Sequence, residues 1–264
     1  MKPEETGPRP LVETERVGEI AVIWMSDPRR RNALSVPLVG GLIQALNSSR
    51  SDGARAAVIA SRETAFCAGA DIGDMLENGW LDGRPSDAAE PTPPDLFEAI
   101  EADGRPILAA VDGFALGGGV ELCLACDLIV AGSSASFMLP ELSLGVLPNT
   151  ALARLPNQIG ARAAADLIFT RRRIDAAEAL RLGMISLLVE GSDVVGQAVA
   201  AAQDLVSKVP PTAFAAAKRN LRRGPDWTSI RAMLGQMDPE EWREGTSAFV
   251  EKRAPDYQRF WVKR

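Results

Sequence analysis

Two glycine-containing turns and two glutamates are the residues whose types and spacing could do chemistry. The turns occupy residues 65–72 (AFCAGADI) and 112–121 (DGFALGGGVE), each directly after a short apolar run and just ahead of residues that can begin a helix. Such a position leaves backbone N–H groups unpaired and directed outward, ready for an anion, and glycine permits the close approach that it requires. One such turn would more simply serve packing. With two of them, we expect the N–H groups of Ala70 and Gly118 to converge.

Glu121 follows the second glycine run, and Glu141 lies between the apolar stretches FMLP and LSLGVL. An isolated glutamate is nearly always a solvated surface residue, but these apolar surroundings are hard to reconcile with that interpretation. Two carboxyl groups beside one apolar pocket can divide proton transfers between them if burial tunes their pKa values. We therefore interpret Glu121 and Glu141 as candidate acid/base residues.

The sequence contains no histidine, which excludes Ser-His-Asp and Cys-His catalysis and histidine-ligated zinc sites. Proton transfer must then fall to carboxylates, lysine, cysteine or the single tyrosine. The three cysteines, Cys67, Cys123 and Cys126, are an odd number in a long chain, so no disulfide framework is expected. Cys123 and Cys126 have the spacing of a redox pair but lie in the apolar stretch ELCLACDLIV, so we interpret them as small buried helix residues.

The charge balance and hydropathy narrow the range of partners. Lys plus Arg is 29 and Asp plus Glu is 35, a formal net charge of −6, which gives no general attraction for nucleic acid. No run approaches the roughly 20 apolar residues that span a membrane. The first ten residues lack a signal-peptide core, and Glu4 and Glu5 argue against a transit peptide. We predict a cytoplasmic protein that binds neither nucleic acid nor membrane.

Apolar periodicity predicts an α/β fold. Residues 11–25 alternate around a turn at 17–19, which is typical of a β-hairpin, and a helix is expected at about 35–49. Three continuous apolar runs have the character of strands buried on both faces, namely residues 56–61, 107–111 and 128–131. Helical stretches lie between these runs, and strand–helix–strand repetition indicates an α/β architecture.

The remainder of the chain divides into a loop and a helical region. Residues 78–94 are rich in Gly, Pro, Asp and Ser, which predicts a mobile surface loop. After Gly160 helices dominate, and we expect them at residues 161–169, 176–182, 194–209 and 212–221. The predicted division is a core over residues 1–192 and a C-terminal helical region over residues 193–264.

Five segments resemble, in order, the enoyl-CoA hydratase/isomerase (crotonase) superfamily. FCAGADI and VDGFALGGGVEL look like its two signature segments. PRRRNAL (28–34) resembles the family's segment beside the coenzyme A diphosphate. FMLPELSLGVLP (137–148) resembles its segment with a catalytic glutamate, and REGTSAFVEKR (243–253) resembles its C-terminal signature. The resemblance covers nearly the whole chain. It implies a crotonase-like spiral of ββα repeats, followed by helices that build a homotrimer or a dimer of trimers.

The resemblance also implies roles for single residues. Ala70 and Gly118 carry over as oxyanion-hole donors for a thioester carbonyl, where losing one donor costs roughly 3–4 kcal/mol. Glu121 would activate water and Glu141 would serve as acid/base at the α-carbon. Arg29 would lie near the coenzyme A phosphates, where a guanidinium suits the ligand. The other implied substrate contacts are Ala68, Asp71, Ile72 and Gly117. Phe249 and Lys252 would reach the nucleotide end, in the same subunit or in a neighbouring one. Asp71 more simply caps the following helix.

Both glutamates are present, which favours hydration or dehydration over isomerisation. We therefore predict a hydro-lyase that adds water reversibly to a 2-enoyl-CoA, with an acyl-CoA thioester as its partner and without metal or redox cofactor. One segment departs from the family: hydratases resembling this chain usually carry Pro-Gly-x-Gly-Gly where this sequence has PNTAL (148–152). The alternatives are a double-bond isomerase, a specialised dehydratase like that of carnitinyl-CoA, and a catalytically silent acyl-CoA-binding subunit.

Overall fold

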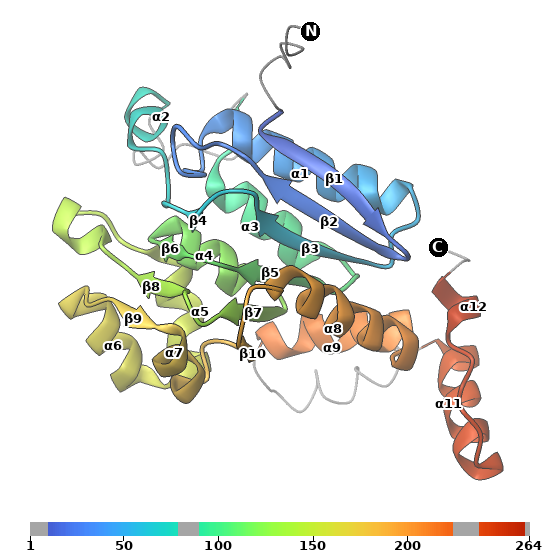
Figure 1. Ribbon diagram of the computed structural model, residues 1–264. Coiled ribbons are helices and arrows are strands. Elements are labelled where there is room, and N and C mark those ends of the chain that lie inside the picture. Colours follow the sequence, from blue (N-terminus) through green and yellow to red (C-terminus); the bar gives the residue numbers. More distant parts are fainter. Residues whose placement is uncertain (1–9, 79–89, 224–237, 262–264) are drawn as a thin grey trace, which may run out of the picture.

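Two sheets organise the molecule in the computed structural model, which describes residues 10–78, 90–223 and 238–261. The larger sheet has the order β1-β2-β3-β5-β7-β10, and the smaller one has the order β4-β6-β8-β9 (Figure 1). The larger sheet consists of β1 (Val12–Val17), β2 (Ile20–Met25), β3 (Ala56–Ser61), β5 (Ile107–Val111), β7 (Leu128–Gly132) and β10 (Leu187–Val189). The smaller sheet consists of β4 (Ala65–Cys67), β6 (Phe114–Leu116), β8 (Ser136–Met138) and β9 (Ile174–Asp175).

Helices cover both sheets, and α11 and α12 lie at one side of the molecule (Figure 1). In chain order the helices are α1 (Val36–Ser51), α2 (Ile72–Glu77), α3 (Pro93–Ala102), α4 (Gly118–Ala125), the 3-10 helix η1 (Glu141–Leu144), α5 (Asn149–Ile159), α6 (Ala161–Thr170), α7 (Ala176–Leu182), α8 (Val194–Lys208), α9 (Pro211–Arg223), α11 (Pro239–Glu251) and α12 (Gln258–Trp261). Across the described ranges, no helix combines the length and the apolar character needed to cross a bilayer.

The chain alternates between the two sheets. β3, β5 and β7 lie in the larger sheet, and each is followed by a strand of the smaller sheet, β4, β6 or β8. A helix follows each of these pairs, and the pairs run parallel within both sheets. This is the expected ββα repeat. Because all repeats run in one direction, the turns after β4 and β6 meet at the same edge of the smaller sheet.

Burial on both faces explains the continuous apolar runs. In β3, Ala57 and Ile59 face the core that α1, α3 and α4 cover, whereas Ala56, Val58 and Ala60 face the opposite side, beneath α8. No face of this strand meets solvent, so no polar residue alternates with the apolar ones. The predicted hairpin is also confirmed, because β1 and β2 pair antiparallel from Val12–Met25 to Val17–Ile20.

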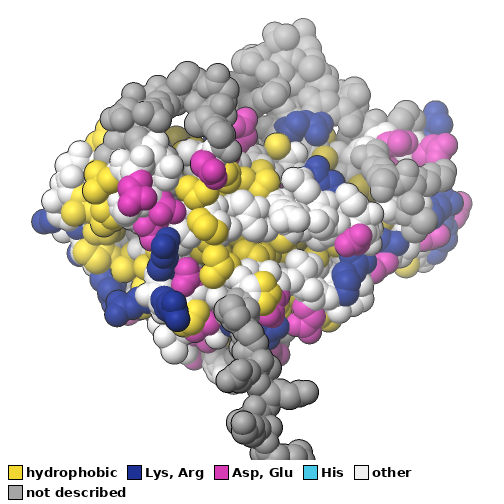
Figure 2. All heavy atoms as spheres, turned by 90° about the horizontal axis from the view of Figure 1, so that it is seen from above, with side chains coloured by type: hydrophobic (Ala, Val, Ile, Leu, Met, Phe, Trp, Pro, Cys, Tyr) yellow, Lys and Arg dark blue, Asp and Glu magenta, His cyan; other side chains and the backbone are white. Residues whose placement is uncertain are grey.

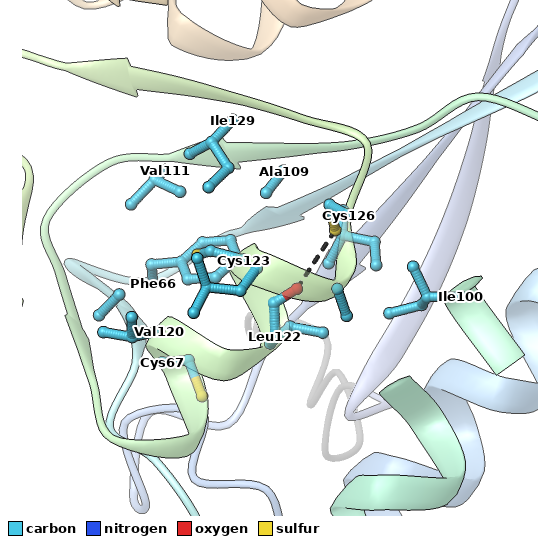
Figure 3. Packing of buried hydrophobic residues seen from close by; sticks show 14 of the residues in the cluster. Phe66, Cys67, Ile100, Ala109, Val111, Val120, Leu122, Cys123, Cys126 and Ile129 are labelled. Atoms are coloured by element: carbon cyan, nitrogen blue, oxygen red, sulfur yellow. Dashed lines mark hydrogen bonds between the residues drawn. The ribbon is translucent and has the colours of Figure 1, made fainter. Parts of the chain in front are cut away.

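All three cysteines are free and buried. Figure 3 shows Cys67, Cys123 and Cys126 among apolar side chains that include Phe66, Val120 and Ile129. Cys126 Sγ donates to Leu122 O at 3.4 Å. Burial raises the pKa of Cys67 to about 12, so its thiol stays protonated. The interpretation of these residues as packing elements is confirmed.

The structure differs from the sequence prediction in three places. The three-residue strands β4, β6 and β8, and with them the smaller sheet, were not predicted. Helix α5, which contains Pro156, was not among the predicted helices. Pro93 and Pro94 open α3, so the loop predicted at residues 78–94 ends earlier than expected. Most of that loop, residues 79–89, lies outside the described residues.

Candidate active site

Ala70 lies between two hydrogen bonds that fix the direction of its N–H group. Leu34 N–H donates to Gly69 O at 2.7 Å, and Leu34 O accepts from Asp71 N–H at 3.3 Å, which is an isolated parallel bridge between Leu34 and Ala70. In this pattern the residue between the two bonds points its own N–H and C=O to the other side. No described residue accepts a hydrogen bond from Ala70 N–H, so this donor remains available to a ligand.

Gly117 turns the chain from β6 into α4. Its φ of 50° and ψ of −119° are open to glycine but not to residues with a side chain. Its N–H donates to Met138 O at 2.8 Å, and its carbonyl accepts from Val120 N–H at 2.8 Å. Gly118 is then the first residue of α4. Its N–H therefore has no intrahelical acceptor and lies where the helix dipole favours negative charge.

The start of α4 packs directly on the turn that contains Ala70. A Cβ on Gly118 would lie 3.1 Å from Ala70 N, and a Cβ on Gly119 would lie only 2.6 Å from Cys67 O. Side chains at these positions would force the two segments apart. The structure thus brings the backbone of Ala70 against that of Gly118, at the edge where β4 and β6 end (Figure 1).

Glu121 lies in the first turn of α4, and its carboxylate holds the beginning of α5. Its Oε1 atom accepts from Thr150 N–H at 2.7 Å and from Ala151 N–H at 3.1 Å. These N–H groups have no acceptor within α5, and the N-cap residue Pro148 makes no side-chain cap, so Glu121 caps this helix. Burial raises the pKa of Glu121, and the two N–H groups offset part of that rise.

Glu141 begins η1 and is placed against Gly117. Its Oε1 and Oε2 atoms are both buried, and neither has a hydrogen-bond partner in the described part of the chain. Burial raises the pKa of Glu141 to about 7, and the charge of Glu121 contributes to the rise. Two carboxyl groups with different partners and one titration near neutrality are suited to acid/base work.

The arginine run at 29–31 divides into one paired and two free side chains. Arg30 Nη1 lies 3.3 Å from Asp71 Oδ2 and 3.7 Å from Asp74 Oδ1. Arg29 and Arg31 are exposed, and neither side chain forms an ion pair with another described residue. Two guanidinium groups are therefore available to a phosphate beside the turn, whereas Arg30 is engaged.

Two of the other predicted contacts in the turn at residues 65–72, Asp71 and Ala68, have hydrogen-bond partners within the protein, whereas Ile72 is exposed. Asp71 Oδ1 accepts from Asp74 N–H at 3.0 Å and caps α2, as interpreted from the sequence. Ala68 N–H donates to Arg31 O at 3.0 Å. Ile72, the first residue of α2, leaves its side chain 52% exposed. It offers an apolar surface next to Ala70.

The predicted nucleotide-end residues are not brought to this place by a single chain. Lys252 is exposed and follows α11 with a left-handed φ of 54°, and α11 lies on the opposite side of the molecule from α2 (Figure 1). The side chain of Phe249 lies outside the described residues. Within the described ranges, no group of three or more Cys, Asp or Glu side chains is arranged to hold a metal ion.

Two features of the site were missed from the sequence. The first is the pair of N–H groups at Thr150 and Ala151, which only the folded helix α5 directs at Glu121. The second is Asn32, a fully buried polar side chain between the arginines and α1. Its φ of 54° is left-handed, and an asparagine in a short loop after a strand is a signal for that conformation.

Comparisons with known proteins find relatives over nearly the whole chain. The family model described as enoyl-CoA hydratase/isomerase matches residues 15–259. A probable enoyl-CoA hydratase of Rhizobium meliloti is 36% identical over 94% of this chain and 97% of its own length. A short-chain-enoyl-CoA hydratase of Clostridium acetobutylicum is 33% identical over 90% of this chain and 94% of its own.

A solved structure extends the likeness to three dimensions. The crystal structure of an enoyl-CoA hydratase from Bacillus anthracis matches with a TM-score of 0.81 and 30% identity, over 94% of this chain and 98% of that one. The crotonase-type α/β fold is therefore confirmed, and the sequence, the fold and the arrangement of the two turns lead to one assignment. The chain belongs to the enoyl-CoA hydratase/isomerase family.

Proposed function

We propose that this protein is an enoyl-CoA hydratase, a lyase that adds water reversibly across the double bond of a 2-enoyl-CoA. The observation that carries the proposal is a pair of carboxyl groups at the start of α4: Glu121 lies in its first turn, and the two oxygens of Glu141 are buried without a hydrogen-bond partner among the described residues. Glu141 also lies directly against Gly117, the residue before Gly118. Isomerisation needs only one such group, whereas hydration needs one for water and one for the α-proton.

Each group has a part in the reaction. The Glu121 carboxylate takes a proton from water as the hydroxyl adds to the β-carbon and the electrons of the double bond move towards the thioester. The N–H groups of Ala70 and Gly118 bind the oxygen on which negative charge accumulates. Protonated Glu141 then donates its proton to the α-carbon. Exchange with water restores both carboxyl groups, and dehydration is the same sequence in reverse.

Basic side chains and backbone groups around the turn at residues 65–72 bind the coenzyme A part of the substrate. Arg29 binds the phosphates as a free, exposed guanidinium, and Ala68, Asp71, Ile72 and Gly117 border the thioester. Lys252 and Phe249 reach the nucleotide end from a neighbouring subunit, because α11 lies far from α2 within one chain. The reaction balances with water and two carboxyl groups, so it requires neither metal nor redox cofactor.

The segment that departs from the family does not remove Glu121 from the site. Asn149 to Leu152 form the first turn of α5, and the N–H groups of Thr150 and Ala151 hold the Glu121 carboxylate. Anchored in this way, Glu121 presents its other oxygen, Oε2, to a water molecule. This favours retained hydration over isomerisation or a silent binding subunit.

The assembly and setting are also proposed. Residues 1–192 carry the active site, and the region over residues 193–264 builds a homotrimer or a dimer of trimers in the cytoplasm. Within that region, α8 packs on the larger sheet of its own subunit. We therefore assign the subunit contacts to the helices that follow α8, namely α9, α11 and α12. On the face seen in Figure 2, the Lys and Arg side chains drawn in colour lie in small groups among Asp and Glu, with no single large basic patch. The formal net charge of −6 supports a protein without a nucleic-acid partner.

One assay tests the function. The absorbance of the conjugated thioester is followed for enoyl-CoA substrates of several chain lengths, with the wild type, Glu121→Gln and Glu141→Gln. We expect turnover by the wild type and loss of at least about 10²-fold in each variant. A wild-type protein that turns over none of the substrates would refute the hydratase. Activity abolished only by Glu141→Gln would instead identify an isomerase.

A further inference from the structure

We infer that Asn32 is a positioning residue that fixes the direction of the Ala70 N–H group. This inference rests on the proposed function, since it concerns the same oxyanion donors. Asn32 is fully buried. Its side-chain oxygen accepts one hydrogen bond, and the two hydrogens on Nδ2 are shared among three acceptors. Its bonds connect three segments, the loop that begins at Asp27, the end of β3 and strand β4, and the last of these leads directly into the turn that contains Ala70.

The side chain first closes its own loop. Asn32 Oδ1 accepts from Asp27 N–H at 2.7 Å, while Asn32 N–H donates to Asp27 O at 3.0 Å. This reciprocal pair sets the path of residues 27–32. Arg31 and Asn32 both have left-handed φ values, 53° and 54°. Two consecutive residues with side chains hold this conformation only where the surroundings enforce it, and asparagine tolerates it better than most residues.

The amide group then ties that loop to the strand before the oxyanion turn. Asn32 Nδ2 lies 2.8 Å from Ser61 Oγ, 3.1 Å from Phe66 O and 3.2 Å from Ala65 O. No water has access to these carbonyl groups, since Ala65 and Phe66 are buried. Asn32 therefore sets the distance between the loop and β4.

The neighbours of Asn32 hold both flanks of Ala70. Arg31 O accepts from Ala68 N–H at 3.0 Å, and Leu34 bonds to Gly69 O and Asp71 N–H. Among the described residues, these three are the backbone hydrogen bonds that join residues 31–34 to residues 68–71. If the loop shifts, the turn shifts with it, and the Ala70 N–H leaves its place opposite Gly118. A displacement of about 1 Å can lower turnover about 10²-fold.

The test compares Asn32→Ala and Asn32→Gly with a matched control, Lys218→Met. The glycine variant keeps the left-handed φ without strain but lacks the amide. Lys218 forms a buried ion pair with Asp127 at the opposite end of β5, so its loss perturbs the fold without touching the oxyanion turn. The readouts are kcat and KM, together with the ultraviolet absorbance of the enolate that forms when acetoacetyl-CoA binds. The charge of that enolate is shared between the ketone oxygen and the thioester oxygen, so donors to the thioester oxygen favour its formation and the signal reports on the two N–H groups.

We expect both Asn32 variants to lose kcat by about 10²-fold, with a much smaller change in KM, and to lose most of the enolate signal. Lys218→Met should keep kcat and the signal below its melting temperature. Wild-type kcat and signal in Asn32→Gly would overturn the inference, as would an equal loss in Lys218→Met. Should the Asn32 variants fail to fold, Ser61→Ala removes one partner of the amide, and an unchanged enolate signal there would also overturn it. Because acetoacetyl-CoA is bound rather than hydrated, this readout stands even if the wild type hydrates no enoyl-CoA.

Discussion

The Oε1 atom of Glu141 lies 2.8 Å from the position that a Cβ on Gly117 would occupy. The Glu141 carboxyl group thus packs against the residue that precedes the donor Gly118. The acid/base group and the first turn of α4 are therefore in direct contact. A side chain at residue 117 would push Glu141 away and would also force an unfavourable φ. The contact explains why the turn needs glycine at this position as well as at 118.

We therefore expect Gly117→Ala to lower kcat by at least about 10²-fold, because it displaces a proton-transfer group and the adjacent oxyanion donor. Steady-state kinetics would measure the loss. The matched control is Gly53→Ala, at a glycine with φ +74° and no atom within 4 Å of the added Cβ. It likewise places a side chain on a residue with positive φ, but away from the site, and should leave kcat unchanged. Equal losses in the two variants would contradict the explanation.

The pKa of Glu141, about 7, predicts opposite pH profiles for the two directions of the reaction. Hydration requires the protonated form, so its kcat/KM should fall as pH rises through about 7. Dehydration requires the carboxylate and should rise through the same value. Measuring both directions with one substrate pair checks this, and a hydration rate that stays level well above pH 7 would contradict the role given to Glu141.

Removing the Glu141 charge should stabilise the protein at high pH. Its pKa is raised from an ordinary 4.5, so between that value and about 7 the folded state binds more protons than the unfolded state, and stability falls as pH rises. Glu141→Gln should therefore match the wild-type melting temperature near pH 4.5 and exceed it above pH 7. Glu178 is a control of opposite sign, since Arg172 lowers its pKa. Glu178→Gln should lower the melting temperature at neutral pH.

Substitutions of Glu121 should separate its two roles. Glu121→Gln keeps an oxygen that can accept from Thr150 and Ala151, so it should lose activity by about 10²–10⁴-fold with little loss of stability. Glu121→Ala also removes the cap of α5, which costs a further ~1 kcal/mol. Chemical denaturation and kinetics on both variants would test this. Equal stabilities would show that the carboxylate does not cap the helix.

Lys218 should matter for stability alone. Its Nζ atom, on a side chain that is 2% exposed, lies 2.8 Å from Asp127 Oδ2 and 2.9 Å from Ile100 O. Removing one member of a buried pair costs about 3–5 kcal/mol. We expect Lys218→Met to be destabilised by about that amount, with kcat unchanged, and the double variant with Asp127→Asn to recover part of the loss. A loss well below 1 kcal/mol in urea denaturation would contradict this.

The sequence allowed much of the fold to be predicted, where a physical constraint acts on neighbouring residues. Burial on both faces leaves strands such as β3 no alternative to apolar residues, and the bounds of α7 follow from its cap and its C-terminal glycine. The strands β4, β6 and β8 have three residues each, too short for any period to stand out. Their pairing depends on partners far along the chain.

The candidate site divides in the same way. The glycines around Ala70 and Gly118 and the two glutamates in apolar surroundings stood out as residue types. The hydrogen bonds of Glu121 to α5 did not, because backbone N–H groups are identical in every residue and only helix geometry directs them. Asn32 was overlooked beside three arginines, since burial of one polar side chain is decided by tertiary packing.

Ala70 and Gly118 lie in different repeats, and they meet where β4 pairs in parallel with β6 and α4 packs on the turn after β4. Contacts between segments so distant in sequence carry a large loop-closure entropy and are slow to form. The local hairpin of β1 and β2 can assemble long before them. During refolding, catalytic activity should therefore return later than secondary structure. The rate at which activity returns would measure how fast the smaller sheet forms.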